Sequence, residues 1–268
     1  MGILEPSSVK DHARALLEAR AITVQIGGHT VCRAMNLALY PGQCWAMLGI
    51  NGVGKTTLLH TLAGLRPSQG GQILMSGIPL IQFSRRARAQ RLGMVFQEAS
   101  SSFPSTVWET MLVSRYPYLG GFGWETERDR AIVASALEAV DLRALAHRET
   151  LALSGGERQR LRIAAFLAQD TPLGLLDEPL NHLDPAYQMR LMARLVDHTR
   201  TQGGALLMVF HDINVAARFC DSCLLIYGDG QTSAGSTGTV LTATALARLY
   251  QHPMMPMNTH WGQGWLPA

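Results

Sequence analysis

A glycine-rich run in the first quarter of the chain has the residue types and spacing of a phosphate-binding loop. The run is Gly49-Ile50-Asn51-Gly52-Val53-Gly54-Lys55-Thr56, a full match to G-x-x-x-x-G-K-[ST]. Glycines let backbone N–H groups close around phosphate oxygens at a helix N-terminus, where the helix dipole favours anions. Lys55 can then reach the β- and γ-phosphates, and the Thr56 hydroxyl can ligate Mg²⁺. By itself the motif predicts only a nucleoside triphosphate, bound by Gly49, Asn51, Gly52, Gly54, Lys55, Thr56 and Thr57.

An acidic pair later in the chain could supply the carboxylates that this nucleotide chemistry needs. The apolar run Leu173–Leu176 ends in Asp177 and Glu178. A strand would bring Asp177 to its carboxyl end, where the carboxylate can hold Mg²⁺. Glu178 can then polarise water for in-line attack on the γ-phosphate. Without the loop at 49–56, the same run would be interpreted as a buried strand ending in a solvated acidic pair.

A second phosphate-binding end is predicted at Leu153-Ser154-Gly155-Gly156-Glu157. Ser154 has the position of a helix N-cap, and Glu157 follows at the spacing of a capping box. The hydroxyl, the glycine amides and the helix dipole together suit a phosphate. An ordinary capped helix is the alternative interpretation. One nucleotide in one chain does not need two such ends, so Ser154, Gly155 and Gly156 are predicted to face ATP bound by a partner copy.

Alternating and helical patterns place these motifs on elements of an α/β fold. The pair Gly27-Gly28 predicts a two-residue hairpin. Strands are predicted at Glu18–Ile26, Val31–Leu39, Gln43–Leu48, Gly71–Ser76, Leu92–Phe96, Leu173–Leu176, Ala205–Phe210 and Leu224–Tyr227. Helices are predicted at Thr56–Leu65, Val107–Ser114, Arg128–Val140, Arg158–Gln169 and Pro185–Arg200. The order predicts a parallel sheet covered on both faces, with a mostly helical lobe inserted.

Composition limits the partners of the chain. Its 268 residues are 47% hydrophobic and 16% charged, which is typical of a globular protein. The net charge of +3 comes without a basic run, so no nucleic-acid partner is expected. The sequence has no run long enough to span a membrane and no signal-peptide core, which predicts a cytosolic protein. The cysteines Cys32, Cys44, Cys220 and Cys223 are expected to be buried thiols.

In this order and spacing, the motifs resemble those of ABC-type nucleotide-binding domains over about residues 19–240. The resemblance implies the ABC ATPase fold, which is a P-loop NTPase core with a mixed sheet, an antiparallel β edge subdomain and an inserted α-helical subdomain. It implies that Gln97 senses Mg²⁺ and the attacking water, and that His211 contacts the γ-phosphate. Asn181-His182-Leu183-Asp184 corresponds to the loop that crosses the dimer interface, where Asp184 is its acid. The implied ligands are ATP and Mg²⁺.

The predicted domain organisation follows from the same resemblance. Residues 1–18 are a lead-in, 19–97 and 166–240 form the ATP-binding core, and 98–165 form the helical subdomain. The segment 241–268 is predicted as a helix and a tail rich in Pro, Met and Trp, and the tail is interpreted as a packed or flexible terminal segment without a flanking strand; soft-metal binding by its Met and His residues is the less favoured alternative.

Three positions depart from the family pattern. Ile26 stands where an aromatic residue usually stacks on adenine, a contact that contributes ~1–3 kcal/mol per base. Leu180 replaces a common threonine, and Gly174 interrupts the strand before Asp177. The Ile26 substitution predicts a weaker preference for adenine, whereas the other two remove no reacting group.

The resemblance also implies partners. Two copies would form a head-to-tail homodimer at the cytoplasmic face of the inner (plasma) membrane, attached to separate integral membrane permease subunits. Ser100–Phe103 and Arg115–Trp124 are candidate docking surface, unless their aromatic residues pack inside the lobe. Four segments are similar to the ATPases of importers for ferric siderophores, haem and cobalamin. They are Val113–Leu119, Gly120–Trp124, Glu127–Asp129 and Cys220-Asp221. Such importers also use a periplasmic or extracellular substrate-binding protein.

Three other classes of ABC protein share these motifs. One is a soluble ABC ATPase that acts on DNA or ribosomes, although the chain has neither a long coiled-coil insertion nor a second ATPase domain. Another is the ATPase of an exporter. A third is a noncatalytic regulator, which would be expected to lose Glu178 or His211, and both are present.

Overall fold

The fold of the chain is taken from a computed structural model. It describes residues 14–97, 104–119 and 124–268. Most of the lead-in, the candidate docking segment Ser100–Phe103 and most of Gly120–Trp124 therefore lie outside the described residues. Within the described part, no helix combines the length and the apolar composition that crossing a bilayer requires.

A mixed six-stranded sheet forms the centre of the fold, as the resemblance predicts. Its strand order is β10-β9-β3-β8-β7-β6, and all neighbours are parallel except β10, which runs antiparallel to β9. The strands are β3 (Cys44–Leu48), β6 (Leu92–Val95), β7 (Leu173–Leu176), β8 (Ala205–Val209), β9 (Ser222–Ile226) and β10 (Thr232–Ser236). Because β6, β7 and β8 are adjacent and parallel, the residues that follow them emerge at one edge of the sheet.

A smaller antiparallel sheet of order β2-β1-β4-β5 lies beside the first. It consists of β1 (Leu17–Ile26), β2 (His29–Leu39), β4 (Gly70–Met75) and β5 (Ile78–Pro79). Ile26 pairs with His29 across the predicted two-residue turn. Gly27 and Gly28 both have positive φ, at 55° and 81°, which is the conformation that this tight hairpin requires.

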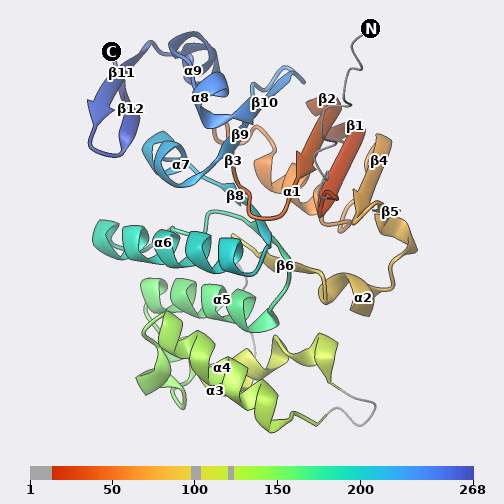
Figure 1. Ribbon diagram of the computed structural model, residues 1–268, viewed down its shortest axis with the longest axis vertical. Coiled ribbons are helices and arrows are strands. Elements are labelled where there is room, and N and C mark those ends of the chain that lie inside the picture. The colour runs from red at the N-terminus through yellow and green to blue at the C-terminus, as the bar shows by residue number, and fades with distance from the viewer. Residues whose placement is uncertain (1–13, 98–103, 120–123) are drawn as a thin grey trace, which may run out of the picture.

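Helices cover both faces of the central sheet (Figure 1). They are α1 (Lys55–Leu62), α2 (Arg85–Ala89), α3 (Val107–Val113), α4 (Glu127–Ala139), α5 (Gly155–Gln169), α6 (Pro185–Thr201), α7 (Ile213–Phe219), α8 (Thr237–Val240) and α9 (Ala243–Tyr250). Short 3-10 turns occur at Leu80–Gln82, Tyr116–Tyr118, Arg143–Leu145 and Thr150–Ala152. In Figure 1, α3 and α4 lie at one end of the molecule, and α5 lies between them and α6.

The alternation of side chains along the strands divides the interior into two cores. In β3, Trp45 and Met47 face a core shared with α1 and the antiparallel sheet. Ala46 and Leu48 face the opposite core, to which α3, α4, α5, α6 and α7 contribute. This period of two fixes which helices each strand contacts. The loop between β3 and α1 is therefore positioned by β3, which is buried along its whole length.

The C-terminal tail differs from the prediction. After α9, the chain forms a hairpin of β11 (Met254–Thr259) and β12 (Gly262–Pro267), and the expectation of a strandless tail was wrong. The hairpin contacts α7 and α9, and Trp265 is 4% exposed. Proline disfavours strands because it lacks an N–H, but it is tolerated at edges. Both strands of a two-stranded hairpin are edges, which explains how Pro256 fits.

Candidate functional site

The phosphate-binding loop lies between β3 and α1, in the context that its motif requires. Gly52 and Gly54 have φ of 76° and 102°, which side chains other than glycine rarely adopt. A Cβ on Gly54 would lie 2.4 Å from a Val31 methyl carbon, so the loop is also too close-packed for a larger residue. The loop borders a cavity of about 510 Å³. Its lining residues are Ile26, Asn51, Gly52, Gly54, Lys55, Thr56, Thr57, Gln97, Glu178 and His211.

Lys55 is held inside its own loop. Its Nζ donates to the carbonyl oxygens of Gly49 and Ile50 at 2.8 and 3.0 Å, and the residue is 6% exposed. Burial lowers the pKa of Lys55, while the nearby charges of Glu178 and Asp177 act in the opposite direction. The cavity therefore has a positive charge, on the buried ammonium of Lys55, near the negative charges of Asp177 and Glu178.

Asp177 is fully buried at the end of β7. Its backbone N–H donates to Val95 at 2.9 Å, but neither carboxylate oxygen has a hydrogen-bond partner among the described residues. Burial raises the pKa of Asp177; the Thr56 hydroxyl lies near enough to lower it without reaching hydrogen-bond geometry. An unpaired buried carboxylate is unfavourable unless a cation or donor joins it. The carboxylate and hydroxyl oxygens here therefore fit a hard divalent cation such as Mg²⁺.

The carboxylate of Glu178 is the point at which three strand ends meet. Gln97, after β6, donates from Nε2 to Oε2 at 3.1 Å. His211, after β8, places Nε2 at 2.7 Å from Oε1. Asn181, in the turn after β7, donates from Nδ2 to Oε2. The structure thus brings the predicted residues Gln97, Glu178 and His211 into one hydrogen-bonded cluster at the edge of the cavity.

Two contacts of Glu178 were not predicted from the sequence. Asn181 was expected only as part of an interface loop, yet its amide contacts the carboxylate directly. Gln159, on the buried face of α5, donates to the carbonyl oxygens of Glu178 and Pro179 at 3.3 and 2.9 Å. The one sequence signal for Gln159 is a polar residue at a position where the helix period requires burial.

Ser154, Gly155, Gly156 and Asp184 lie apart from this cavity. Ser154 is the N-cap of α5 and forms the predicted capping box, with Glu157 N to Ser154 Oγ at 3.2 Å and Ser154 N to Glu157 Oε2 at 2.7 Å. A Cβ on Gly156 would lie 3.0 Å from the His182 carbonyl oxygen, so this helix end packs on the 181–184 loop. Asp184 caps α6 by accepting from Tyr187 N at 2.9 Å. None of the four lines the cavity of Lys55.

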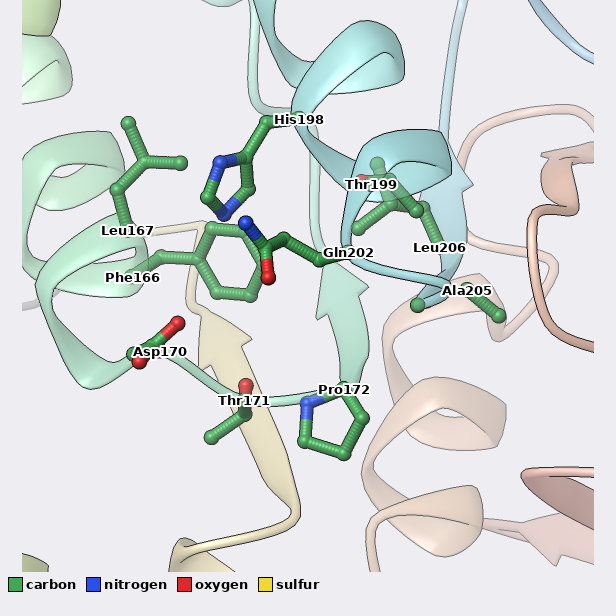
Figure 2. A pocket seen from close by; sticks show the side chains of 11 residues that line it. Phe166, Leu167, Asp170, Thr171, Pro172, His198, Thr199, Gln202, Ala205 and Leu206 are labelled. Carbon is green, nitrogen blue, oxygen red and sulfur yellow. The ribbon is translucent and has the colours of Figure 1, made fainter.

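The remaining departures from the family pattern have clear locations. Ile26 lines the cavity and is 38% exposed, and no Phe, Tyr or Trp of the described residues lines it. Gly174 lies under the ring of Phe166, where a Cβ would approach Phe166 Cζ to 2.6 Å and Leu206 Cδ2 to 2.5 Å. Phe166 also lines a separate cavity of about 200 Å³, between the C-terminal ends of α5 and α6 (Figure 2). No predicted site residue borders that second cavity.

Comparison with known proteins agrees with this geometry. A family model for ABC transporters matches residues 32–181, more than half of the chain. The chain is 39% identical to a hemin import ATP-binding protein of Myxococcus xanthus, over 87% of this chain and 89% of that protein. It is 32% identical to an iron(3+)-hydroxamate import ATP-binding protein of Bacillus subtilis, over 88% and 87%.

A solved structure gives the same result for the fold. A chain from a transporter assigned to the metal-chelate type, in an inward-facing conformation, superposes with a TM-score of 0.82 at 27% identity. The superposition covers 95% of this chain and 98% of that one. The phosphate-binding loop, the acidic pair at the end of β7 and the capped glycine pair of α5 are thus found together on the fold of their family, and the chain belongs to the ABC transporter family as an ATP-binding, ATP-hydrolysing subunit.

Proposed function

We propose that this chain hydrolyses ATP as one half of a homodimer and energises import of a metal chelate, such as a ferric siderophore or haem, or of cobalamin. One observation carries the proposal: Lys55 lines the cavity, whereas Ser154 does not. A cavity with only one of its two phosphate-binding ends is incomplete until a second copy supplies the other. The cargo class is supported by the two import proteins named above, which are 39% and 32% identical to this chain.

Within one copy, the loop from Gly49 to Thr57 binds the triphosphate. Lys55 exchanges its two carbonyl acceptors for phosphate oxygens, which are stronger acceptors because they are charged. Thr56, Asp177 and Gln97 are assigned to Mg²⁺, on the ground that the Asp177 oxygens are buried and unpartnered among the described residues. The bound ion would neutralise charge that develops on the phosphates.

Glu178 is assigned as the general base. Its carboxylate borders the cavity and is fixed by three donors, so it can orient a water molecule with little loss of freedom. Gln97 positions that water, and His211 contacts the γ-phosphate. Both side chains already converge on the same carboxylate, which supports a shared role.

The dimer places Ser154, Gly155 and Gly156 of one copy against the γ-phosphate held by the other. Asp184, the last residue of the 181–184 loop and the N-cap of α6, contributes to that interface. Ser154 and Asp184 are exposed, as surfaces that await a partner must be. Closure would then depend on ATP, because only a triphosphate contacts both ends.

We further propose that the dimer docks on integral membrane permease subunits at the cytoplasmic face of the inner membrane, with a periplasmic or extracellular substrate-binding protein delivering cargo. Tyr116 and Trp124 support a docking surface in the segment 115–124, since they are 74% and 78% exposed and do not pack inside the lobe, whereas Arg115 of the same segment is buried and takes no part in it. The predicted division into a core at 19–97 and 166–240, a helical subdomain at 98–165 and terminal segments at 1–18 and 241–268 is retained as part of the proposal.

The test is to isolate the tagged chain from membranes of its source and identify the proteins that accompany it. A many-spanning permease is the expected companion, and adding that permease with loaded binding protein should accelerate phosphate release. Lys55→Ala is the matched control, since it should keep the permease and lose ATP turnover. Recovery with DNA or ribosomes, and without a membrane protein, would contradict the proposal.

A further inference from the structure

The buried amide of Gln159 connects α5 to the catalytic turn. The residue is 2% exposed, and its Nε2 donates to the carbonyl oxygens of both Glu178 and Pro179. Its Oε1 accepts from Arg162 Nη1 at 2.9 Å. Arg162 Nη1 also donates to the Gln97 carbonyl oxygen at 3.2 Å. Two residues one turn apart on α5 therefore hold the backbone of Glu178 and of its neighbour Gln97.

The turn that Gln159 holds has an unfavourable backbone conformation. Glu178 has φ of 50°, in the left-handed region that residues with a side chain seldom occupy. Such a conformation persists only where surrounding contacts impose it. The side chain of Glu178 is fixed by Gln97, and its carbonyl oxygen is fixed by Gln159. The side chain and the backbone of Glu178 are thus both held by contacts that lead to α5, through Gln97 and Arg162 in one case and through Gln159 in the other.

That same helix begins at the second phosphate-binding end. Ser154 caps α5, and Gln159 lies five residues further along, a little more than one turn. A continuous α-helix transmits a displacement of its N-terminus over this distance without bending. A shift of Ser154 that moves α5 as a body would therefore reach the carbonyl oxygens of Glu178 and Pro179 through Gln159.

We propose that Gln159 is a positioning residue that sets the catalytic geometry of Glu178 according to the position of α5. The inference rests on the proposed function, in which Ser154 meets the ATP of the partner copy. Engagement of one active site then adjusts the general base of the other. Gln159 does not line the cavity, so its replacement should lower turnover while leaving ATP binding intact.

Gln169 provides a matched control on the same helix. Its Nε2 also donates to two backbone carbonyl oxygens, those of Ala89 at 2.7 Å and Leu92 at 3.3 Å. These acceptors lie at the other end of α5, beside the start of β6 and away from the cavity. Replacing either glutamine with methionine removes two donations to backbone carbonyl oxygens and keeps the volume; Gln159→Met also removes the bond that Gln159 Oε1 accepts from Arg162. A merely structural role predicts the same outcome at both positions.

The experiment compares Gln159→Met and Gln169→Met in the full chain by melting temperature, KM for ATP and kcat. For Gln159→Met, kcat should fall by about tenfold or more with KM within about threefold, as for a lost transition-state interaction. Gln169→Met should show a similar decrease in melting temperature. Its kcat should stay within about twofold of wild type, since its hydrogen bonds lie outside the site. Equal kcat values for the two variants would overturn the inference.

Two further measurements keep the outcome unambiguous. In a Glu178→Gln background, Gln159→Met should still form the ATP-dependent dimer, and loss of that dimer would overturn a role confined to positioning. If Gln159→Met fails to fold, Gln159→Glu replaces it under the same criterion, because its carboxylate keeps the Arg162 contact and faces two carbonyl oxygens without a proton to donate. A wild-type chain without ATP turnover would refute the proposed function instead.

Discussion

The imidazole Nε2 of His211 lies 2.7 Å from Oε1 of Glu178, although the residues are 33 positions apart in the sequence. The two side chains differ in exposure, at 43% for His211 and 8% for Glu178. The histidine therefore reaches from the solvent side to a carboxylate that is otherwise enclosed by protein. This contact joins the ends of β8 and β7 and orients the carboxylate along the edge of the cavity that Lys55 lines.

Replacing Glu178 by glutamine tests this carboxylate as the general base. Glu178→Gln keeps the shape of the side chain but removes the basic oxygen, so ATP should bind and turnover should fall by about 100-fold or more. The stalled chain should accumulate as an ATP-bound dimer, measured by gel filtration with nucleotide present. Glu127→Gln is a control on an exposed carboxylate, at 91%. Undiminished phosphate release by Glu178→Gln would defeat the assignment.

Substitution of Gly174 tests the packing of β7 under Phe166. A Cβ at this position would clash with Phe166 Cζ and Leu206 Cδ2, so Gly174→Ala should reduce the free energy of unfolding by ~1–3 kcal/mol. Adding Phe166→Leu should recover part of that loss, because the two sites are in contact. Gly238→Ala is the control, since nothing lies within 4 Å of its added Cβ. Urea denaturation compares wild type, Gly174→Ala, Phe166→Leu, the double variant and Gly238→Ala, and additive losses from the two single changes would exclude the clash.

The buried pair of Arg115 and Asp129 predicts a pH-dependent stability of the helical lobe. Nε of Arg115 lies 2.9 Å from Oδ1 of Asp129, and their side chains are 6% and 8% exposed. Burial acts to raise the pKa of Asp129, but hydrogen bonds from Thr126 and Arg115 outweigh it and hold that pKa below its ordinary value. The stabilisation is therefore complete above the unfolded-state pKa and is lost as pH falls through the folded-state pKa.

Asp129→Asn should accordingly lower the free energy of unfolding by about 3 kcal/mol at pH 7, because it leaves a buried guanidinium without its counter-charge. The difference from wild type should begin to shrink below about pH 4, where the unfolded-state carboxylate takes up its proton, and should be lost only below the lower folded-state pKa. Asp229→Asn is the control, as its pair with Arg248 is about half exposed and contributes ~0–1 kcal/mol. Urea denaturation between pH 7 and pH 3 checks this, and a constant difference would argue against it.

The C-terminal hairpin should depend on Asn214. Its Nδ2 donates to the Trp265 carbonyl oxygen at 3.1 Å, and its Oδ1 accepts from Trp265 N at 2.8 Å. Asn214→Ala removes both bonds and leaves buried groups unpaired, which costs ~1–3 kcal/mol of local stability. Faster hydrogen exchange at the Trp265 amide is the expected readout. Asn258→Ala, at an exposed position of the same hairpin, is the control and should leave that amide unchanged.

The sequence alone was sufficient for features that depend on neighbouring residues. The strand–loop–helix context of the glycine-rich loop at 49–56, the two-glycine hairpin turn and the capping box of Ser154 and Glu157 all occur as predicted, because their hydrogen bonds and φ values are set within a few positions. The main strands were located for a similar reason, since side-chain alternation reflects burial on either face. The C-terminal hairpin escaped prediction because its prolines and glycines disfavour strands in general.

Only the tertiary structure decided which distant residues meet. Gln97 and His211 reach Glu178 because β6, β7 and β8 are adjacent and parallel. No local sequence pattern determines this strand order. Contacts such as Gln159 with the Glu178 carbonyl oxygen likewise arise from the way α5 packs on the sheet. Local chemistry fixes what each segment can bind, whereas the packing of buried faces fixes where each segment lies, and this second step requires the whole chain.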